Sequence, residues 1–118
     1  MRVKIVKSSK IKEQNFNDIM NVKSLLSSKD FKNISISIIK QSGTNKKHRQ
    51  MKCHYFAFVM AGSGEYLIDN KKYNVENGDL IIIPKGTAYK DSGNMTLLVI
   101  NTPRFNPKQI EFFLCTHP

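Results

Sequence analysis

The sequence predicts an all-β fold, a barrel or a sandwich, and three observations lead to this prediction. Short segments rich in Ile, Val, Tyr and Phe recur along the chain, and in several of them apolar residues alternate with polar ones. Turn residues separate these segments about every 8–12 positions, which is typical of all-β domains. The 118 residues, 40% hydrophobic and 24% charged, suit one compact domain.

The first 33 residues predict a basic N-terminal arm that packs on the barrel. Residues 2–6 alternate basic and β-branched side chains, which predicts a short strand. Residues 16–27 place apolar side chains three or four positions apart, which favours a short helix. The barrel itself is expected to span residues 34–118.

Strands and turns follow in order through the rest of the chain. Ile34, Ile36 and Ile38 alternate with serines and predict a half-buried strand. Further strands are expected at 55–60, 65–68, 71–75, 80–83, 95–101 and 110–114. Turns are expected at 69–70, 77–78 and 91–94, and the glycines of 62–64 predict a turn or a close backbone approach.

Two segments and the exit of the last long strand carry a family resemblance. The segment GDLIIIPKG at 78–86 resembles the second conserved motif of the cupin superfamily, and VMAGSGE at 59–65 resembles the end of the first. NTPRFNP at 101–107 is similar to the tail of many small single-domain cupins. The resemblance covers residues 34–107 and implies a cupin-type double-stranded β-helix, that is, a jelly-roll barrel.

The same resemblance implies where a metal would be held. Metal-binding cupins use two histidines and a glutamate from the first motif and a third histidine after the second. Counting from the motif glycines, these positions fall on His48, Gln50, Tyr55 and Tyr89. A shift by one residue in the 43–53 loop gives poorer ligands still. One imidazole, one amide and two phenols form a poor cage for a divalent cation, so we expect no metal cofactor. A divalent metal with His48 as a ligand is the alternative.

A barrel lined by these side chains is expected to bind a small molecule. His48, Gln50, Tyr55 and Tyr89 offer hydrogen bonds and aromatic faces to a sugar-like molecule or an aromatic acid. Arg49, within a basic stretch at 46–52, favours an anionic ligand. In the opposing interpretation, the two tyrosines only fill the barrel.

Whether the chain is an enzyme stays open at this point. One alternative is a sugar or sugar-phosphate isomerase, epimerase or lyase, in which Tyr89, Tyr55 and His48 are the candidate catalytic residues. Another is an interaction protein that uses its basic N-terminal half. Residues 1–52 hold 13 Lys or Arg against 3 Asp or Glu, and the net charge of the chain is +10. These lysines are spread out rather than clustered on an aromatic platform, so nucleic acid is not an expected partner.

The remaining expectations concern cellular location, thiols and assembly. No apolar run approaches the roughly 20 residues that cross a membrane, and the first residues lack a signal peptide's apolar stretch, which predicts a cytoplasmic protein. Cys53 and Cys115 are expected to be reduced. We also expect a homodimer, formed by exchange of the N-terminal strand at 2–6.

Overall fold

The computed structural model describes residues 3–113, and its regular structure is almost entirely β. The strands are β1 (Gln14–Asn17), β2 (Met20–Ser24), β3 (Ser35–Thr44), β4 (His48–Gln50), β5 (His54–Ile68), β6 (Lys71–Glu76), β7 (Leu80–Ile83), β8 (Tyr89–Thr102) and β9 (Ile110–Phe112). Two short 3₁₀ helices, η1 (Ser8–Lys10) and η2 (Pro107–Gln109), complete it. The predicted all-β barrel is therefore confirmed. The end of the predicted strand 110–114, and Cys115, lie outside the described residues.

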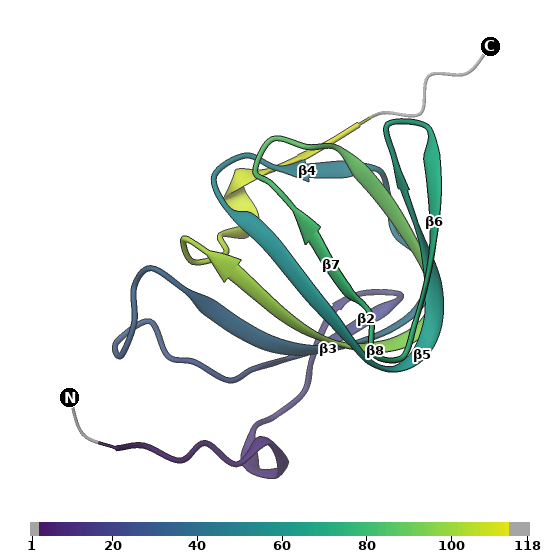
Figure 1. Ribbon diagram of the computed structural model, residues 1–118. Helices are drawn as coiled ribbons and strands as arrows, with labels where there is room; N and C mark the ends of the chain where they lie inside the picture. The colour runs from purple at the N-terminus through teal and green to yellow at the C-terminus, as the bar shows by residue number, and fades with distance from the viewer. Residues whose placement is uncertain (1–2, 114–118) are drawn as a thin grey trace.

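The strands form one antiparallel sheet that curls into a barrel (Figure 1). The long strands β5 and β8 pair with each other from His54 opposite Thr102 to Ile68 opposite Tyr89. The other edge of β8 pairs with β3 and then with β4, and the other edge of β5 pairs with β7 and then with β6. β3, β4, β6 and β7 each pair with one of these two long strands, so β5 and β8 fix the register of the barrel wall.

Two glycines allow the backbones of β5 and β8 to approach closely. Gly64 lies opposite Gly93, and a Cβ built on Gly93 would come 2.5 Å from the Gly64 Cα. Gly93 also has φ +147°, which L side chains rarely adopt. The expected close backbone approach at 62–64 is thus confirmed, whereas the turn predicted at 91–94 is wrong, because those residues continue β8.

The predicted helix at 16–27 is also wrong. Those residues form parts of a hairpin, β1 and β2, which extends the edge of the sheet beside β3 with Val22 opposite Ile39. The hydrogen bonds of an unpaired β3 edge favour strand addition over a short, weakly amphipathic helix, which is marginal on its own. Residues 3–6 form no strand in this chain.

The predicted turns at 69–70 and 77–78 are confirmed. Asp69 and Asn70, at the tip of the β5–β6 hairpin, have φ of 51° and 61°, which is the left-handed geometry of a tight hairpin turn. In the next turn, the Glu76 amide donates a 2.8 Å hydrogen bond to Asp79 Oδ2. Asp79 therefore has a structural role before β7.

Strand alternation divides the barrel wall into an inner and an outer face. Tyr55, Ala57 and Val59 of β5 point inward and are at most 6% exposed, while His54 points outward and accepts a hydrogen bond from the Lys85 amide. Inward residues of β7 and β8 complete the core. Among residues 3–113, no helix is long and apolar enough to cross a membrane.

Candidate functional site

A cavity of about 230 Å³ lies inside the curled sheet. Its apolar lining includes Phe16, Val22, Leu97, Phe105 and Phe112, and its polar lining includes Gln41, Asn45, His48, Gln50, Tyr55, Tyr89, Asp91 and Asn101. Gln41, Asn45 and His48 gather around Asp91, and we call this part of the cavity the polar end. A cavity lined in this way suits a small molecule that carries both polar and apolar groups.

The short strand β4 determines which of the predicted residues reach the cavity. His48 and Gln50 point inward and are buried, and His48 lies opposite Tyr89 of β8. Arg49, between them, points the other way, where its guanidinium lies 2.9 Å from the Glu111 carboxylate. The structure thus brings together four of the five predicted ligand-binding residues and places Arg49 outside the cavity.

The ring of His48 is held in one orientation. Its Nδ1 lies 2.7 Å from the Lys46 carbonyl oxygen, and its ring packs on Tyr89 with centroids 4.4 Å apart. Because a carbonyl oxygen only accepts hydrogen bonds, Nδ1 must carry a proton. In the neutral ring the lone pair then lies on Nε2, where a ligand's hydrogen can approach it.

Three tyrosines pack together beside His48. The hydroxyls of Tyr55 and Tyr66 share a 2.7 Å hydrogen bond, and the Tyr89 ring centroid lies 5.3 Å and 5.9 Å from theirs. Burial raises the pKa of all three hydroxyls well above the ordinary value, so at neutral pH each carries its proton. The cluster can therefore donate hydrogen bonds or protons without carrying charge.

Asp91 is the ionisable residue that sequence reasoning missed. It is 3% exposed and lies on β8 opposite Tyr66, in the segment that was predicted as a turn. Burial raises the pKa of its carboxyl, and the neighbouring His48 and the amides of Gln41 and Asn45 act against that rise. The strand continues the inward alternation of Tyr89, and this alternation was the available signal.

Two buried acceptor atoms at this polar end lack a partner. Among the described residues, Gln41 Oε1 and Asp91 Oδ1 have no hydrogen bond. Leaving a buried acceptor unpaired costs about 1–3 kcal/mol, so such atoms are rare unless a bound molecule serves them. Both residues line the cavity.

Gln50 is fixed by a neighbouring thiol. Cys53 Sγ donates to Gln50 Oε1 at 2.5 Å, and the Gln50 amide forms a hydrogen bond with Tyr89 that partly offsets the rise in that tyrosine's pKa. Burial raises the pKa of the Cys53 thiol to about 11, which makes it a hydrogen-bond donor rather than a nucleophile at neutral pH. Cys53 is free, as expected.

The donor set does not fit a divalent metal. In the described part of the chain, no three His, Cys, Asp or Glu side chains come together in a way that could hold an ion. His48 and Asp91 are the ionisable donors at the polar end, and the cupin ligand positions beside His48 hold an amide and two phenols. Phenols that burial keeps protonated are poor ligands for a divalent cation.

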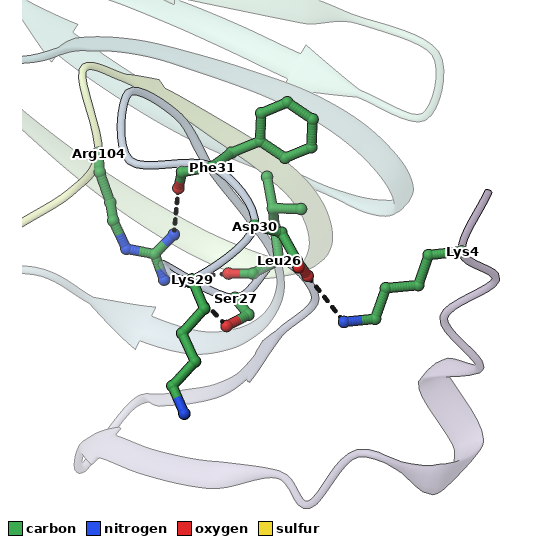
Figure 2. Close-up of polar contacts among 7 residues, drawn as sticks. All are labelled: Lys4, Leu26, Ser27, Lys29, Asp30, Phe31 and Arg104. Carbon is green, nitrogen blue, oxygen red and sulfur yellow. Dashed lines mark hydrogen bonds and ion pairs between the residues drawn. The ribbon is translucent and has the colours of Figure 1, made fainter. Parts of the chain in front are cut away.

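Arg104 lines the cavity and also holds the loop between β2 and β3. Its guanidinium donates to the carbonyls of Leu26 (3.0 Å), Ile34 (3.2 Å) and Phe31 (3.5 Å), as Figure 2 shows for Leu26 and Phe31. The same loop is tied to the segment before η1 by a 2.7 Å ion pair between Asp30 and Lys4 (Figure 2). Since Arg104 also lines the cavity, its position links the loop to the site.

Comparisons with known proteins identify the family and the fold. The sequence model of ethanolamine utilisation protein EutQ matches residues 1–101. No protein with curated annotation matches the chain. Among solved structures, a variant of Streptomyces PAC13 with uridine has a TM-score of 0.83 at 14% identity and covers 96% of this chain and 92% of its own.

Two further solved structures have the same overall fold as this chain. KdgF from Halomonas sp. has a TM-score of 0.80 at 13% identity, covering 91% of this chain and 99% of its own. The polyketide cyclase RemF from Streptomyces resistomycificus has a TM-score of 0.83 at 16% identity, covering 98% and 88%. At these identities the likeness shows the fold, which is the cupin barrel that the motifs at 59–65 and 78–86 predicted.

Proposed function

This chain belongs to the family of ethanolamine utilisation protein EutQ, and we propose that it binds a small, uncharged, hydroxyl-bearing molecule in its barrel without a metal ion. The observation that carries the proposal is the pair of unpartnered acceptors, Gln41 Oε1 and Asp91 Oδ1, at the polar end of the cavity. Ligand hydroxyls would donate to both. Tyr89 and His48 would then contact the same polar edge of the ligand.

Size and shape support a compact ligand. The cavity volume of about 230 Å³ lies below the roughly 300–1,000 Å³ of pockets for drug-sized molecules. Apolar lining residues such as Leu97 and Phe105 would cover a ring or an aliphatic part of the ligand. A sugar-like molecule or a nucleoside fragment combines such a part with hydroxyl groups.

Charge favours a neutral ligand over the anionic one that the basic stretch at 46–52 predicts. Lys46 and Lys47 are exposed, and Arg49 pairs with Glu111 outside the cavity. Inside, the guanidinium of Arg104 lines the cavity but is bonded to backbone carbonyls, while Asp91 adds a carboxyl to the polar end, which would repel an anion when ionised. The exposed lysines leave the alternative of an interaction protein as a separate prediction.

A second candidate function is an enzyme that transfers a proton on the bound molecule. The observation that favours it is the fixed ring of His48, whose Nδ1 is bonded to the Lys46 carbonyl. Nε2 could then accept a proton from the ligand, while a neutral tyrosine such as Tyr89 donates one to a departing hydroxyl. Among the similar structures, PAC13 is described as a nucleoside dehydratase and RemF as a polyketide cyclase, which supports testing this chemistry.

The test is a thermal-shift screen of protein treated with a chelator. The panel holds neutral sugars, nucleosides including uridine, ethanolamine (named in the family's description), sugar phosphates and aromatic acids. A neutral hydroxylated compound should raise the Tm of the wild type, because a ligand that binds only the folded state stabilises it. His48→Gln and Tyr89→Phe should lose most of that shift, whereas Tyr73→Phe, at an exposed tyrosine on β6, should keep it.

Three results would count against the proposal. They are the absence of any hit, a hit that appears only after metal is restored, and a preference for anionic compounds. For the second candidate, an NMR time course with the best ligand should show a new product that His48→Gln does not form. A ligand that stays unchanged would exclude the enzyme and leave ligand binding as the supported function.

A further inference from the structure

A second group of polar side chains lines the cavity, at some distance from the polar end. Three neighbouring strands, β2, β3 and β8, form this part of the wall (Figure 1), and residues opposite one another make rungs across them. Gln41 lies on one rung, and the next inward-facing rung consists of Val22, Ile39 and Leu97. The cavity is therefore apolar directly beyond Gln41.

Beyond this apolar rung, the next two inward-facing rungs bring polar residues back. Ser24 lies opposite Ser37, and Ser35 lies opposite Asn101. These four residues also line the cavity, and we call them the second polar end. Because each strand residue advances about 3.3 Å, Ser37 lies roughly 13 Å along β3 from Gln41.

Asn101 is a buried amide with free hydrogen-bonding groups. The residue is 6% exposed, and its Oδ1 lies 3.8 Å from the Cys53 thiol. Among residues 3–113, its side-chain NH₂ donates no hydrogen bond. Buried polar side chains are almost always paired, and the few exceptions call for an explanation such as a bound molecule. Since Asn101 lines the cavity, its free NH₂ marks a place for a hydrogen-bond acceptor of a ligand.

Two serines add hydroxyl groups to the second polar end. Ser35 Oγ accepts a 3.1 Å hydrogen bond from the Phe105 amide, which leaves its O–H free to donate. The Ser37 hydroxyl forms no hydrogen bond within the described part of the chain. By contrast, the unpartnered atoms at the polar end, Gln41 Oε1 and Asp91 Oδ1, are acceptors. The two ends of the cavity thus call for different groups on a ligand.

We propose that the ligand of this cavity is bifunctional: its hydroxyls bind at the polar end, and a neutral amide group at the other end of the molecule binds Asn101 and Ser37. This inference rests on the proposed function and adds a second group to the ligand described there. After about 3 Å is allowed for each hydrogen bond, the hydroxyls and the amide would lie roughly 7 Å apart. The apolar rung between the two ends would contact the ring or chain that joins them.

An amide fits the second polar end better than a carboxylate does. Asn101 can donate to an amide carbonyl and accept from an amide N–H, whereas a carboxylate has no hydrogen to donate in return. Arg104, which lines the cavity, already donates to the carbonyls of Leu26 at 3.0 Å and Ile34 at 3.2 Å. A carboxylate would have to displace these bonds to pair with this cation.

The test compares three ribosides by isothermal titration calorimetry on chelator-treated protein. Phenyl β-D-ribofuranoside carries the hydroxyls and a ring, the 4-carbamoylphenyl riboside adds the amide, and the 4-carboxyphenyl riboside replaces that amide by a carboxylate. The carbamoyl compound should bind at least about tenfold more tightly than the phenyl compound, because the phenyl compound leaves the buried Asn101 amide unpaired. The carboxyl compound should bind more weakly than the carbamoyl compound.

Variants at the second polar end separate this contact from a general effect on folding. Asn101→Leu removes the amide at similar volume, so the affinities for the phenyl and carbamoyl compounds should come within about twofold of each other. Affinity for the phenyl compound itself should not change. Ser37→Ala, at a partly exposed residue, should reduce the preference for the carbamoyl compound at least about threefold, and it serves as the test if Asn101→Leu does not fold. The matched controls Asn94→Leu and Ser42→Ala, at exposed residues of β8 and β3, should keep the full preference.

Three results would overturn the inference while hydroxyl binding at the polar end still stands. They are equal affinities of the wild type for the phenyl and carbamoyl compounds, tighter binding of the carboxyl compound, and a preference for the carbamoyl compound that survives both Asn101→Leu and Ser37→Ala. If none of the three ribosides binds, the result counts against the proposed function and this inference together.

Discussion

Asp91→Asn should make the protein more stable at neutral pH while it weakens the binding site. The Asp91 carboxyl is 3% exposed, and burial raises its pKa above the ordinary value of 3.8 despite the opposing effect of His48. The folded state therefore binds the Asp91 proton more tightly than the unfolded state does. The contribution of this group to stability consequently falls as pH rises from about 3.8 through the folded pKa.

The size of the effect follows from the contacts of the carboxyl. Asp91 Oδ1 and Gln41 Oε1 both lack partners among the described residues, and an unpaired buried polar group costs about 1–3 kcal/mol. The amide introduced at position 91 carries no charge and offers N–H donors to Gln41 nearby. We expect a gain of about 1–3 kcal/mol at pH 8, or roughly 3–10 °C in Tm for a domain of this size.

Urea unfolding at pH 4.5 and pH 8 measures this change. The gain should be smaller at pH 4.5, where the native carboxyl already keeps more of its proton. Asp69→Asn, at the tip of the β5–β6 hairpin, removes an exposed carboxylate and should change stability by less than about 0.5 kcal/mol. A loss of stability at pH 8, or an equal effect at both pH values, would show that the Asp91 charge stabilises the fold and would refute the reasoning.

Four further predictions follow from the packing and the hydrogen bonds. Tyr55→Phe and Tyr66→Phe should each lower the free energy of unfolding by about 1–3 kcal/mol, because each change leaves the other buried hydroxyl without its partner. The double variant should lose less than the sum of the two. Additive values in urea unfolding would contradict the 2.7 Å hydrogen bond. The stability of the wild type should also fall above about pH 10, because the two tyrosines ionise in the unfolded chain but keep their protons in the fold, where their pKa values are raised. A free energy of unfolding that does not change with pH above 10 would contradict this. Gly93→Ala should lower the free energy of unfolding by at least about 3 kcal/mol, because the added Cβ meets the backbone of β5. Gly78→Ala has open space around the added Cβ and should cost only about 1–2 kcal/mol, from backbone strain. Equal denaturation midpoints for the two variants would contradict this reasoning. Arg104→Met should speed amide hydrogen exchange in the loop between β2 and β3 by at least about tenfold, because it removes hydrogen bonds from a charged donor; unchanged exchange would show that the loop is held otherwise.

Much of the fold could be predicted because strand-forming and turn-forming residues are local features of the sequence. The run from Tyr55 to Met60 is aromatic and β-branched and predicts a strand, and the structure places Tyr55 inside and His54 outside, as the two-residue period of a strand requires. The motif at 78–86 likewise predicts β7 and the turn before it. These are local patterns, so a single sequence contains them.

The errors arose where distant contacts decide the conformation. Asp, Ser, Gly and Asn at 91–94 are turn-forming residues, but Gly93 is needed there because the β5 backbone passes against it. Because residues 91–94 were predicted as a turn, Asp91 was not identified as a residue of the site. Part of the segment 16–27 belongs to the β1–β2 hairpin because the edge of β3 is available to it, which no local periodicity shows.

The central claim is that the polar end of the cavity is a metal-free binding site for a neutral, hydroxylated molecule. The most direct test is a crystal structure of chelator-treated protein with the best compound from the thermal-shift screen. We predict ligand hydroxyls within hydrogen-bond distance of Asp91 Oδ1 and Gln41 Oε1, and His48 Nε2 in contact with the ligand. A ligand bound elsewhere, or a metal ion retained beside His48 with the ligand attached to it, would contradict the account.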